Sequence, residues 1–156
     1  MPIGDYCRAP VQRASPSESL RVVAQRMDRE GVGTVVIVDG QRVSGVVTDR
    51  DLALAVLERG QDPDATPVSA LIEHRPVVVH AASPLRVAAG LMRAHGVRRL
   101  PVVDAEERLV GVISRDDLLQ LLGRELGAMS AALGLQDPHG SSLVSLDEMR
   151  RWEEVV

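Results

Sequence analysis

The residues best suited to chemistry are a hydroxyl and a carboxylate three positions apart, and this pair occurs twice. Thr48 precedes Asp51 in the sequence Thr-Asp-Arg-Asp, and Ser114 precedes Asp117 in Ser-Arg-Asp-Asp. A hydroxyl at a helix N-cap with an acidic residue three positions later is close to a capping box, which satisfies free backbone N–H groups. Either copy, taken alone, is best explained as the start of a helix.

The same atoms could also bind a ligand. A strand that runs directly into a helix places the helix N-terminus, with its free N–H groups and positive dipole end, at the mouth of a cleft. A hydroxyl there can bond a phosphate or ribose oxygen, and a carboxylate suits the 2′ and 3′ hydroxyls of a ribose. The cap and the ligand site are compatible, and we expect both in at least one copy.

An anionic ligand needs positive charge close by. The candidate cations are Arg50, Arg98, Arg99 and Arg115. Each is otherwise a solvated surface residue, as arginine usually is. Arg98 and Arg99 precede a predicted strand, so we expect them to point to opposite faces, with one facing a cleft. The first copy has Gly33 and Thr34 there. We therefore predict that the second site, or whichever cleft Arg98 or Arg99 reaches, binds phosphate better.

Both motifs close a longer repeat. Leu20, Val23, Ala24, Met27 and Gly31 recur 65 residues later as Leu85, Ala88, Ala89, Met92 and Gly96. Each set predicts one face of an amphipathic helix that stops at glycine. Segment 32–39 aligns with 97–104 at the same offset, and 45–51 aligns with 111–117 one residue further on. Upstream, segment 3–7 before Pro10 resembles 68–72 before Pro76.

Each copy is predicted to hold a strand, a helix, a two-stranded hairpin and a second helix. The predicted elements are 10–14, 18–30, 34–38, 43–47 and 49–58 in the first copy, and 77–80, 84–95, 100–103, 109–113 and 115–126 in the second. The hairpin strands are continuous apolar runs, typical of strands covered on both faces or nearly so.

Two such repeats resemble a tandem pair of cystathionine-β-synthase-type (CBS) domains, also called a Bateman module. The resemblance rests on the segment 97–104 and on the Gly-apolar-apolar-Thr/Ser-x-x-Asp-Leu that closes each copy, and it covers residues 3–126. It implies an α/β (α+β) fold of two βαββα repeats packed with pseudo-twofold symmetry. The expected domains are 1–62 and 63–127, followed by a helical extension over 128–156.

The resemblance also implies a ligand and its site. In CBS pairs that bind adenosyl ligands, the matching residues contact the ligand, and here these are Thr48, Asp51, Ser114 and Asp117. The apolar slot for adenine comes from the first strand of a repeat and the hairpin strands. Its candidates are Val11, Val77 and Val78, for each of which core packing is the alternative. The expected regulatory ligands are AMP, ADP, ATP or S-adenosylmethionine, and no cofactor is expected.

The favoured function is a regulatory module that binds an adenosyl ligand between its repeats and signals in trans to an unidentified protein. The ligand would act by favouring one packing of the module or of its dimer, since relatives commonly form homodimers. The alternative is a scaffold or interaction protein that keeps the fold and binds no small molecule. An enzyme is not expected, because the sequence contains no P-loop, no G-x-G-x-x-G and no G-x-S-x-G motif.

Composition excludes further classes. The single cysteine, Cys7, excludes an intramolecular disulfide and any multi-cysteine metal site. The four histidines are scattered, without an i, i+4 pair or a ligand cluster, which argues against a metal site; they are His74, His80, His95 and His139. The balance of 18 basic and 22 acidic residues argues against nucleic acid as the main partner. No apolar run approaches the ~20 residues of a membrane span, and no signal peptide is recognisable, so a cytoplasmic location is expected.

The tail lies outside the repeats. Segment 128–133 is expected to extend the preceding helix, and a capping box at 145–148 predicts a further helix to about residue 154. Leu146, Met149 and Trp152 fall near one face of it. This face would either dock on its own module or serve as a handle for a partner or second subunit.

Overall fold

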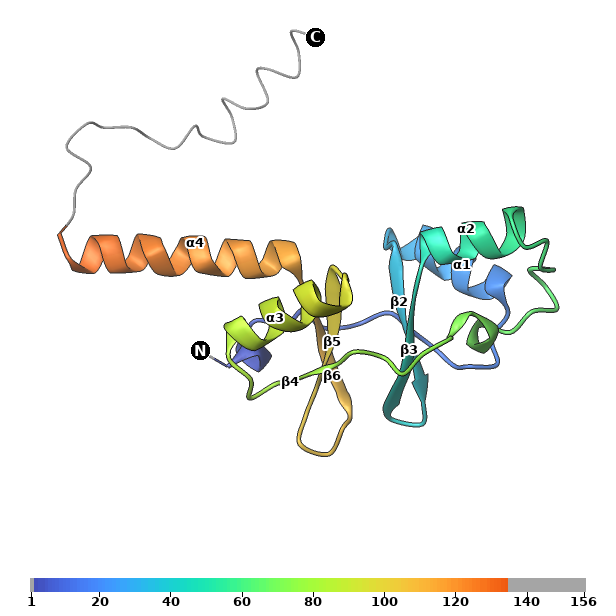
Figure 1. The fold of residues 1–156 in the computed structure, drawn as a ribbon, viewed down its shortest axis with the longest axis horizontal. Helices are drawn as coiled ribbons and strands as arrows, with labels where there is room; N and C mark the ends of the chain where they lie inside the picture. The colour runs from blue at the N-terminus through green and yellow to red at the C-terminus, as the bar shows by residue number, and fades with distance from the viewer. Residues whose placement is uncertain (1, 135–156) are drawn as a thin grey trace, which may run out of the picture. The chain divides into compact units, whose positions relative to one another are not determined.

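The two copies of the repeat fold into two small sheets of the same design, each accompanied by helices (Figure 1). The structure is a computed structural model that describes residues 2–134. The chain divides into two units, 1–121 and 122–156, and both sheets lie in the first. The helix predicted over 145–154, with Leu146, Met149 and Trp152, lies outside the described residues, as does His139.

The first repeat follows the predicted order of elements. These are the 3₁₀ helix η1 (Ile3–Asp5), β1 (Arg13–Ala14), α1 (Leu20–Glu30), β2 (Thr34–Asp39), β3 (Arg42–Thr48) and α2 (Asp49–Leu57). The side chain of Ser19 caps the start of α1 by accepting a hydrogen bond from the Val22 N–H. Gly31 ends α1 with a φ of 61°, a left-handed conformation that glycine adopts without strain.

The second repeat has the same order. Its elements are the 3₁₀ helix η2 (Val68–Leu71), β4 (Val79–His80), α3 (Leu85–His95), β5 (Arg99–Val103), β6 (Leu109–Ser114) and α4 (Arg115–Ala132). The sequence does not predict the two 3₁₀ helices, which occupy the lead-in segment of each repeat. α4 continues beyond residue 126 to Ala132, so the expected extension of this helix is confirmed.

Both sheets have the same strand order and the same irregularity. β1 pairs in parallel with β2, and β2 pairs antiparallel with β3; β4, β5 and β6 repeat this arrangement. The register shifts between Ile37 and Val38 in the first hairpin and between Val102 and Val103 in the second. These positions correspond in the repeat, so the structure confirms the duplication inferred from the sequence.

The central strands are covered as their apolar sequences predict. Four consecutive residues are buried in β2 and four in β5. In β6, buried and half-buried residues alternate, so one face of this strand is covered less completely than the other. β6 lies at the end of its sheet in the strand order, as β3 does, and one face of it is less covered.

Each lead-in segment packs against the other repeat. Ile3 is fully buried in the core of the second repeat, at whose margin Cys7 lies half-buried. Val68 is fully buried in the core of the first repeat, with Ile72 packed against it. This exchange ties the two repeats together and brings a segment from each one to the strand-to-helix corner of the other. A third cluster also joins them, with the buried residues Val36, Val38 and Leu109.

Candidate functional site

The two strand-to-helix corners have the capping geometry that the sequence predicts. The N–H and hydroxyl of Thr48 donate to Oδ2 of Asp51 at 2.8 and 2.7 Å, and the Asp51 N–H donates to Oγ1 of Thr48 at 3.3 Å. The N–H and hydroxyl of Ser114 donate to Oδ2 of Asp117 at 2.9 and 2.5 Å. Both corners are therefore helix caps. Each cap uses one carboxylate oxygen, so the other oxygen, Oδ1, decides whether the corner can also bind a ligand.

At the second corner, Oδ1 is already engaged. Nε and Nη2 of Arg8 lie 2.8 and 2.7 Å from Oδ1 of Asp117. Only 8% of Asp117 is exposed. Burial raises the pKa of Asp117, but the hydrogen bonds from Ser114 and Arg8 outweigh burial and hold this pKa below its ordinary value. Both carboxylate oxygens of Asp117 therefore have partners, because the lead-in segment of the first repeat brings Arg8 to this corner.

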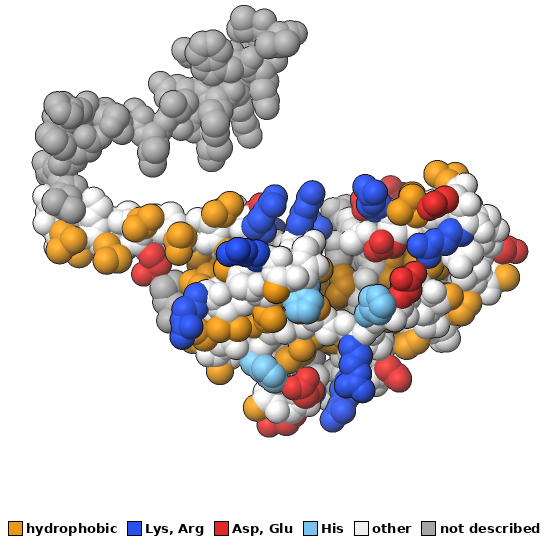
Figure 2. All heavy atoms as spheres, in the orientation of Figure 1, with side chains coloured by type: hydrophobic (Ala, Val, Ile, Leu, Met, Phe, Trp, Pro, Cys, Tyr) orange, Lys and Arg blue, Asp and Glu red, His pale blue; other side chains and the backbone are white. Residues whose placement is uncertain are grey.

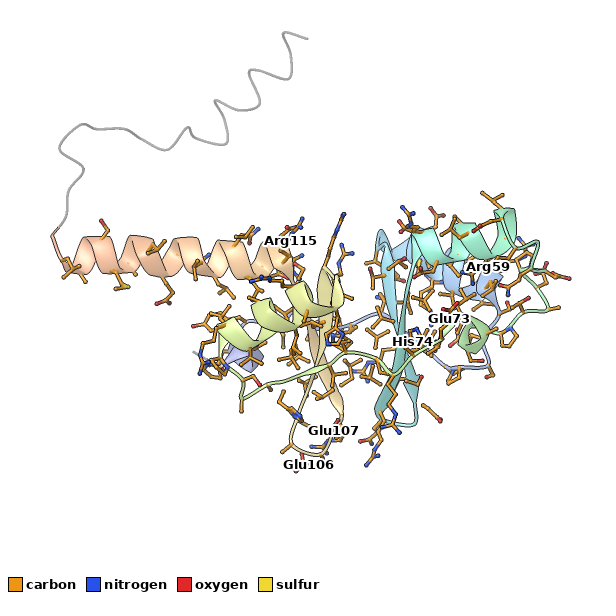
Figure 3. The ribbon with its side chains drawn as sticks, in the orientation of Figure 1. Arg59, Glu73, His74, Glu106, Glu107 and Arg115 are labelled. Carbon is orange, nitrogen blue, oxygen red and sulfur yellow. The ribbon has the colours of Figure 1, made fainter. Side chains whose placement is uncertain are left out.

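At the first corner, Oδ1 is available. Asp51 is exposed, and its Oδ1 has no hydrogen-bond or ion-pair partner among the residues that the structure describes. The lead-in residue beside this corner is Glu73, whose carboxylate lies 3.7 Å from Nη1 of Arg59 (Figure 3). The two corners therefore share their caps and differ in what their second oxygen contacts.

A cavity of about 750 Å³ lies at the first corner, between the two repeats. The first repeat lines it with the start of α2, including Thr48, Arg50 and Asp51. The second repeat lines it with Arg98 and Arg99, which approach from the start of β5. The cleft that Arg98 and Arg99 reach, for which the sequence predicts the better phosphate binding, is thus the one at the first corner. Both arginines line the cavity, Arg98 from just before β5 and Arg99 as the first residue of β5.

Arg99 also connects the two repeats. Its Nη1 donates a hydrogen bond to Oγ1 of Thr34 at 3.0 Å, and Thr34 is the first residue of β2. Arg115, the first residue of α4, is exposed and donates its backbone N–H to the Arg98 carbonyl at 2.9 Å. Arg115 is not among the residues lining the cavity. Of the four predicted cations, the cavity thus gathers Arg50, Arg98 and Arg99.

The three valines proposed for an apolar slot lie in three places. Val77 lines the cavity, in which Val46 and Ile72 provide further apolar surface. Val78 lines a neighbouring hollow of about 590 Å³. Val11 packs against the cluster that joins the repeats. Val11 and Val77 belong to different repeats and lie in different places, and of the three valines only Val77 lines the cavity at the first corner.

Sequence reasoning missed several charged residues around this cavity. They are Asp49, Arg59, Glu73, His74 and Arg75. Basic, acidic and histidine side chains lie close together on the face that Figure 2 shows. The sequence analysis also missed Arg8. A signal for it was present, because the residues that follow the aligned segments 3–7 and 68–72 are Arg8 and Glu73, which have opposite charges.

The described residues provide little for a metal or a membrane. Between residues 2 and 134, no three or more His, Cys, Asp or Glu side chains are grouped so that they could hold a metal ion. His80 lies 3.5 Å from Glu107, outside the cavity. Within the same range, no helix is long and apolar enough to cross a bilayer.

Comparison with known proteins identifies similar sequences. The sequence model of the CBS domain matches residues 3–58 and 68–124. The chain is 32% identical over 120 residues to the uncharacterized Methanopyrus kandleri protein MK0525, covering 76% of this chain and 61% of that protein. It is 32% identical over 119 residues to hypoxic response protein 1 of Mycobacterium tuberculosis, covering 76% of this chain and 82% of that one.

Solved structures share the fold. Hypoxic Response Protein I, solved with two coordinated zinc ions, matches with a TM-score of 0.70 and 30% identity over 77% of this chain and 98% of that chain. The CBS domain protein PAE2072 from Pyrobaculum aerophilum, complexed with AMP, matches with a TM-score of 0.68 and 30% identity over 75% of this chain and 89% of that chain.

Proposed function

Because the chain belongs to the CBS domain family, we propose that the cavity at the Thr48 corner binds an adenine nucleotide and that its occupancy regulates a partner protein. The observation that carries the proposal is that Oδ1 of Asp51 remains available at the corner. It has no partner among the described residues, and it shares a cavity with arginines from the other repeat. The complex of PAE2072 with AMP supports this class of ligand.

Each part of a nucleotide has a matching group in this cavity. The ribose hydroxyls would donate to Oδ1 of Asp51, as hydroxyls do to carboxylates in other nucleotide sites. The phosphate would be bound by Arg98 and Arg99, because guanidinium groups suit phosphate oxygens in charge and geometry. The adenine would lie against the aliphatic side chains of Ile72 and Val77.

Charge favours a phosphate-bearing ligand over S-adenosylmethionine. The cavity is lined by five arginines, Arg50, Arg59, Arg75, Arg98 and Arg99, and by three acidic residues, Asp49, Asp51 and Glu73. An excess of guanidinium groups attracts the phosphates of AMP, ADP or ATP. It repels the sulfonium and ammonium groups of S-adenosylmethionine. We therefore place the adenine nucleotides first among the adenosyl ligands.

Regulation would follow from the position of the cavity between the repeats. A nucleotide held by Asp51 from the first repeat and by Arg98 and Arg99 from the second contacts both at once. It would favour the packing of the repeats that allows all these contacts, and the shift is limited by its differential affinity for the two packings. The ligand would act as a regulatory signal and undergo no reaction, and the partner would read the change in trans in the cytoplasm.

Isothermal titration calorimetry with adenosine, AMP, ADP and ATP tests the proposal. Asp51→Asn should abolish or strongly weaken binding, because the amide retains one oxygen for the cap and replaces the other with a donor. Asp117→Asn is the matched control, since it makes the same change in the other cap and should leave the first site intact. Wild-type protein that binds none of these ligands at millimolar concentration would favour the alternative of a scaffold that keeps the fold.

We also infer that the module pairs with a second copy of itself along α4. The large apolar residues Leu119, Leu122, Leu126, Met129 and Leu133 are all more than half exposed. Their spacing alternates between three and four residues, the period at which two helices interlock in a coiled coil. Figure 2 shows hydrophobic side chains gathered along this helix. Such a stripe is complementary to a second copy of itself.

Light scattering after size-exclusion chromatography tests this pairing. Wild-type protein should have the mass of a dimer, and Leu126→Asp should convert it to a monomer. Leu57→Asp is the control, because Leu57 is 85% exposed at the end of α2 and lies outside the stripe. A wild-type monomer, or a Leu126→Asp protein that remains dimeric, would contradict pairing through α4.

A further inference from the structure

We propose that Arg8 closes the second of two nucleotide corners, so that each chain binds one nucleotide. The inference rests on the function proposed for the first corner and adds its stoichiometry. It starts from the two carboxylates. Oδ2 of Asp117 accepts from Ser114 and Oδ1 contacts the Arg8 guanidinium at 2.7 and 2.8 Å, so neither oxygen remains for a ribose. At Asp51, only Oδ2 is used.

The backbone holds Arg8 in this position. The Arg8 N–H donates to the Val112 carbonyl at 2.9 Å, and the Val112 N–H donates to the Arg8 carbonyl at 3.1 Å. A Cβ added to the neighbouring Gly111 would collide with Sγ and Cβ of Cys7, so this glycine permits the close approach of the lead-in segment. The guanidinium is therefore delivered to Asp117 by a segment paired directly to β6.

The corresponding residue at the first corner carries the opposite charge. Ile72 packs against Gly45 as Cys7 packs against Gly111, so Glu73, which follows Ile72, is the counterpart of Arg8 in the repeat. A carboxylate cannot form an ion pair with Asp51, and Glu73 instead lies near Arg59. The packing of a lead-in residue on a strand glycine is thus common to both sides, whereas the backbone pairing of Arg8 with Val112 has no counterpart between Glu73 and Val46 among the described residues. The charge of the lead-in residue sets which aspartate remains available.

A second difference between the corners, in the cations available for a phosphate, also favours ligand binding at the first corner. The position of Arg98 and Arg99 in the second repeat is taken by Gly33 and Thr34 in the first. The first corner therefore combines a free carboxylate oxygen with cations from the opposite repeat, and the second corner combines an engaged carboxylate with uncharged residues at the matching position. A ligand that relies on the ribose contact can occupy the second corner only while Arg8 is displaced. Its apparent affinity there equals its intrinsic affinity multiplied by the fraction of molecules in which Arg8 is displaced.

Calorimetric titration with AMP, in which the ribose contact weighs heavily, tests the closure. The wild-type chain should bind one equivalent. Arg8→Ala removes an exposed side chain and leaves the backbone pairing in place. It should bind a second equivalent through the freed Asp117 carboxylate, more weakly than the first because Gly33 and Thr34 provide no cation. Arg8→Glu, which copies the residue at the first corner, should do the same. The double variant Arg8→Ala/Asp117→Asn should return to one equivalent, and the control Glu73→Ala should not gain a second one.

The outcomes separate this inference from the proposed function. Two equivalents on the wild-type chain, or one equivalent on both Arg8 variants, would overturn the closure by Arg8 and leave the first site standing. Unchanged AMP binding by Asp51→Asn would overturn the first site. A second equivalent that appears in Arg8→Ala and survives in the double variant would also overturn the closure, because the new site would not be the Asp117 corner.

Discussion

Replacing Arg98 and Arg99 with glutamine should weaken AMP binding and leave adenosine binding nearly unchanged. Both side chains line the cavity and neither belongs to a core. Glutamine keeps polarity and part of the length of each side chain, so the change removes charge with little loss of packing. Adenosine and AMP differ only in the phosphate, so comparing the two ligands isolates the contact between guanidinium and phosphate.

The expected size of the effect follows from exposure. A hydrogen bond to a charged group contributes about 1.5–3 kcal/mol, whereas an exposed ion pair contributes at most about 1 kcal/mol. Both arginines are exposed, and Arg99 gives up its bond to Thr34 when it turns to a phosphate. We therefore assign about 1 kcal/mol to each, or ~2 kcal/mol for the pair. This corresponds to AMP binding that is about 30-fold weaker.

Calorimetry at low and at physiological salt provides the measurement. The AMP affinity of the wild-type protein should fall as salt rises, because exposed charges are screened, while the adenosine affinity should not change. The glutamine variant should lose most of this salt dependence. The reasoning is refuted if the variant weakens adenosine as much as AMP, since the arginines would then shape the cavity without binding phosphate. It is also refuted if AMP affinity is unchanged.

Three further predictions concern stability. Gly111→Ala should destabilise the protein by about 1–3 kcal/mol in chemical denaturation, because its Cβ would collide with Cys7; an unchanged midpoint would contradict the close approach. Gly123→Ala should stabilise α4 by up to about 1 kcal/mol, since its Cβ meets no atom, and a loss of stability would contradict that open surface. Asp117 has a lowered pKa, so its ion pair with Arg8 stabilises the fold above about pH 4 and is lost at lower pH. Asp117→Asn should flatten this acid-induced loss in thermal unfolding, and an unchanged pH profile would refute the assignment.

The caps were predictable because they are local. A hydroxyl and a carboxylate three residues apart at the start of a helix specify the bonds of a capping box without help from the rest of the chain. Thr48 with Asp51 and Ser114 with Asp117 form these bonds as expected. The order of helices and strands was predictable for a similar reason, since the apolar periodicity within each repeat is a local signal. The duplication shows the same pattern twice in the sequence.

The contact between Arg8 and Asp117 was not predictable, because it depends on which repeat each lead-in segment contacts. The sequence shows that segment 3–7 resembles 68–72, but it does not say that each packs against the opposite repeat. Arg8 and Asp117 are far apart in the chain, and only the exchange brings them together.

Arg8 also neutralises the negative charge of Asp117, which is buried at the second corner. The helix cap requires Asp117, and the fold buries this carboxylate almost completely. An ionised carboxylate that is buried with one oxygen unpaired is costly, so a corner without a ligand needs a cation of its own. Asp51 is exposed to water and does not need one. The charge at the lead-in position therefore matches the exposure of each carboxylate: Arg8 pairs with the buried Asp117, and Glu73 leaves the exposed Asp51 without an ion-pair partner among the described residues.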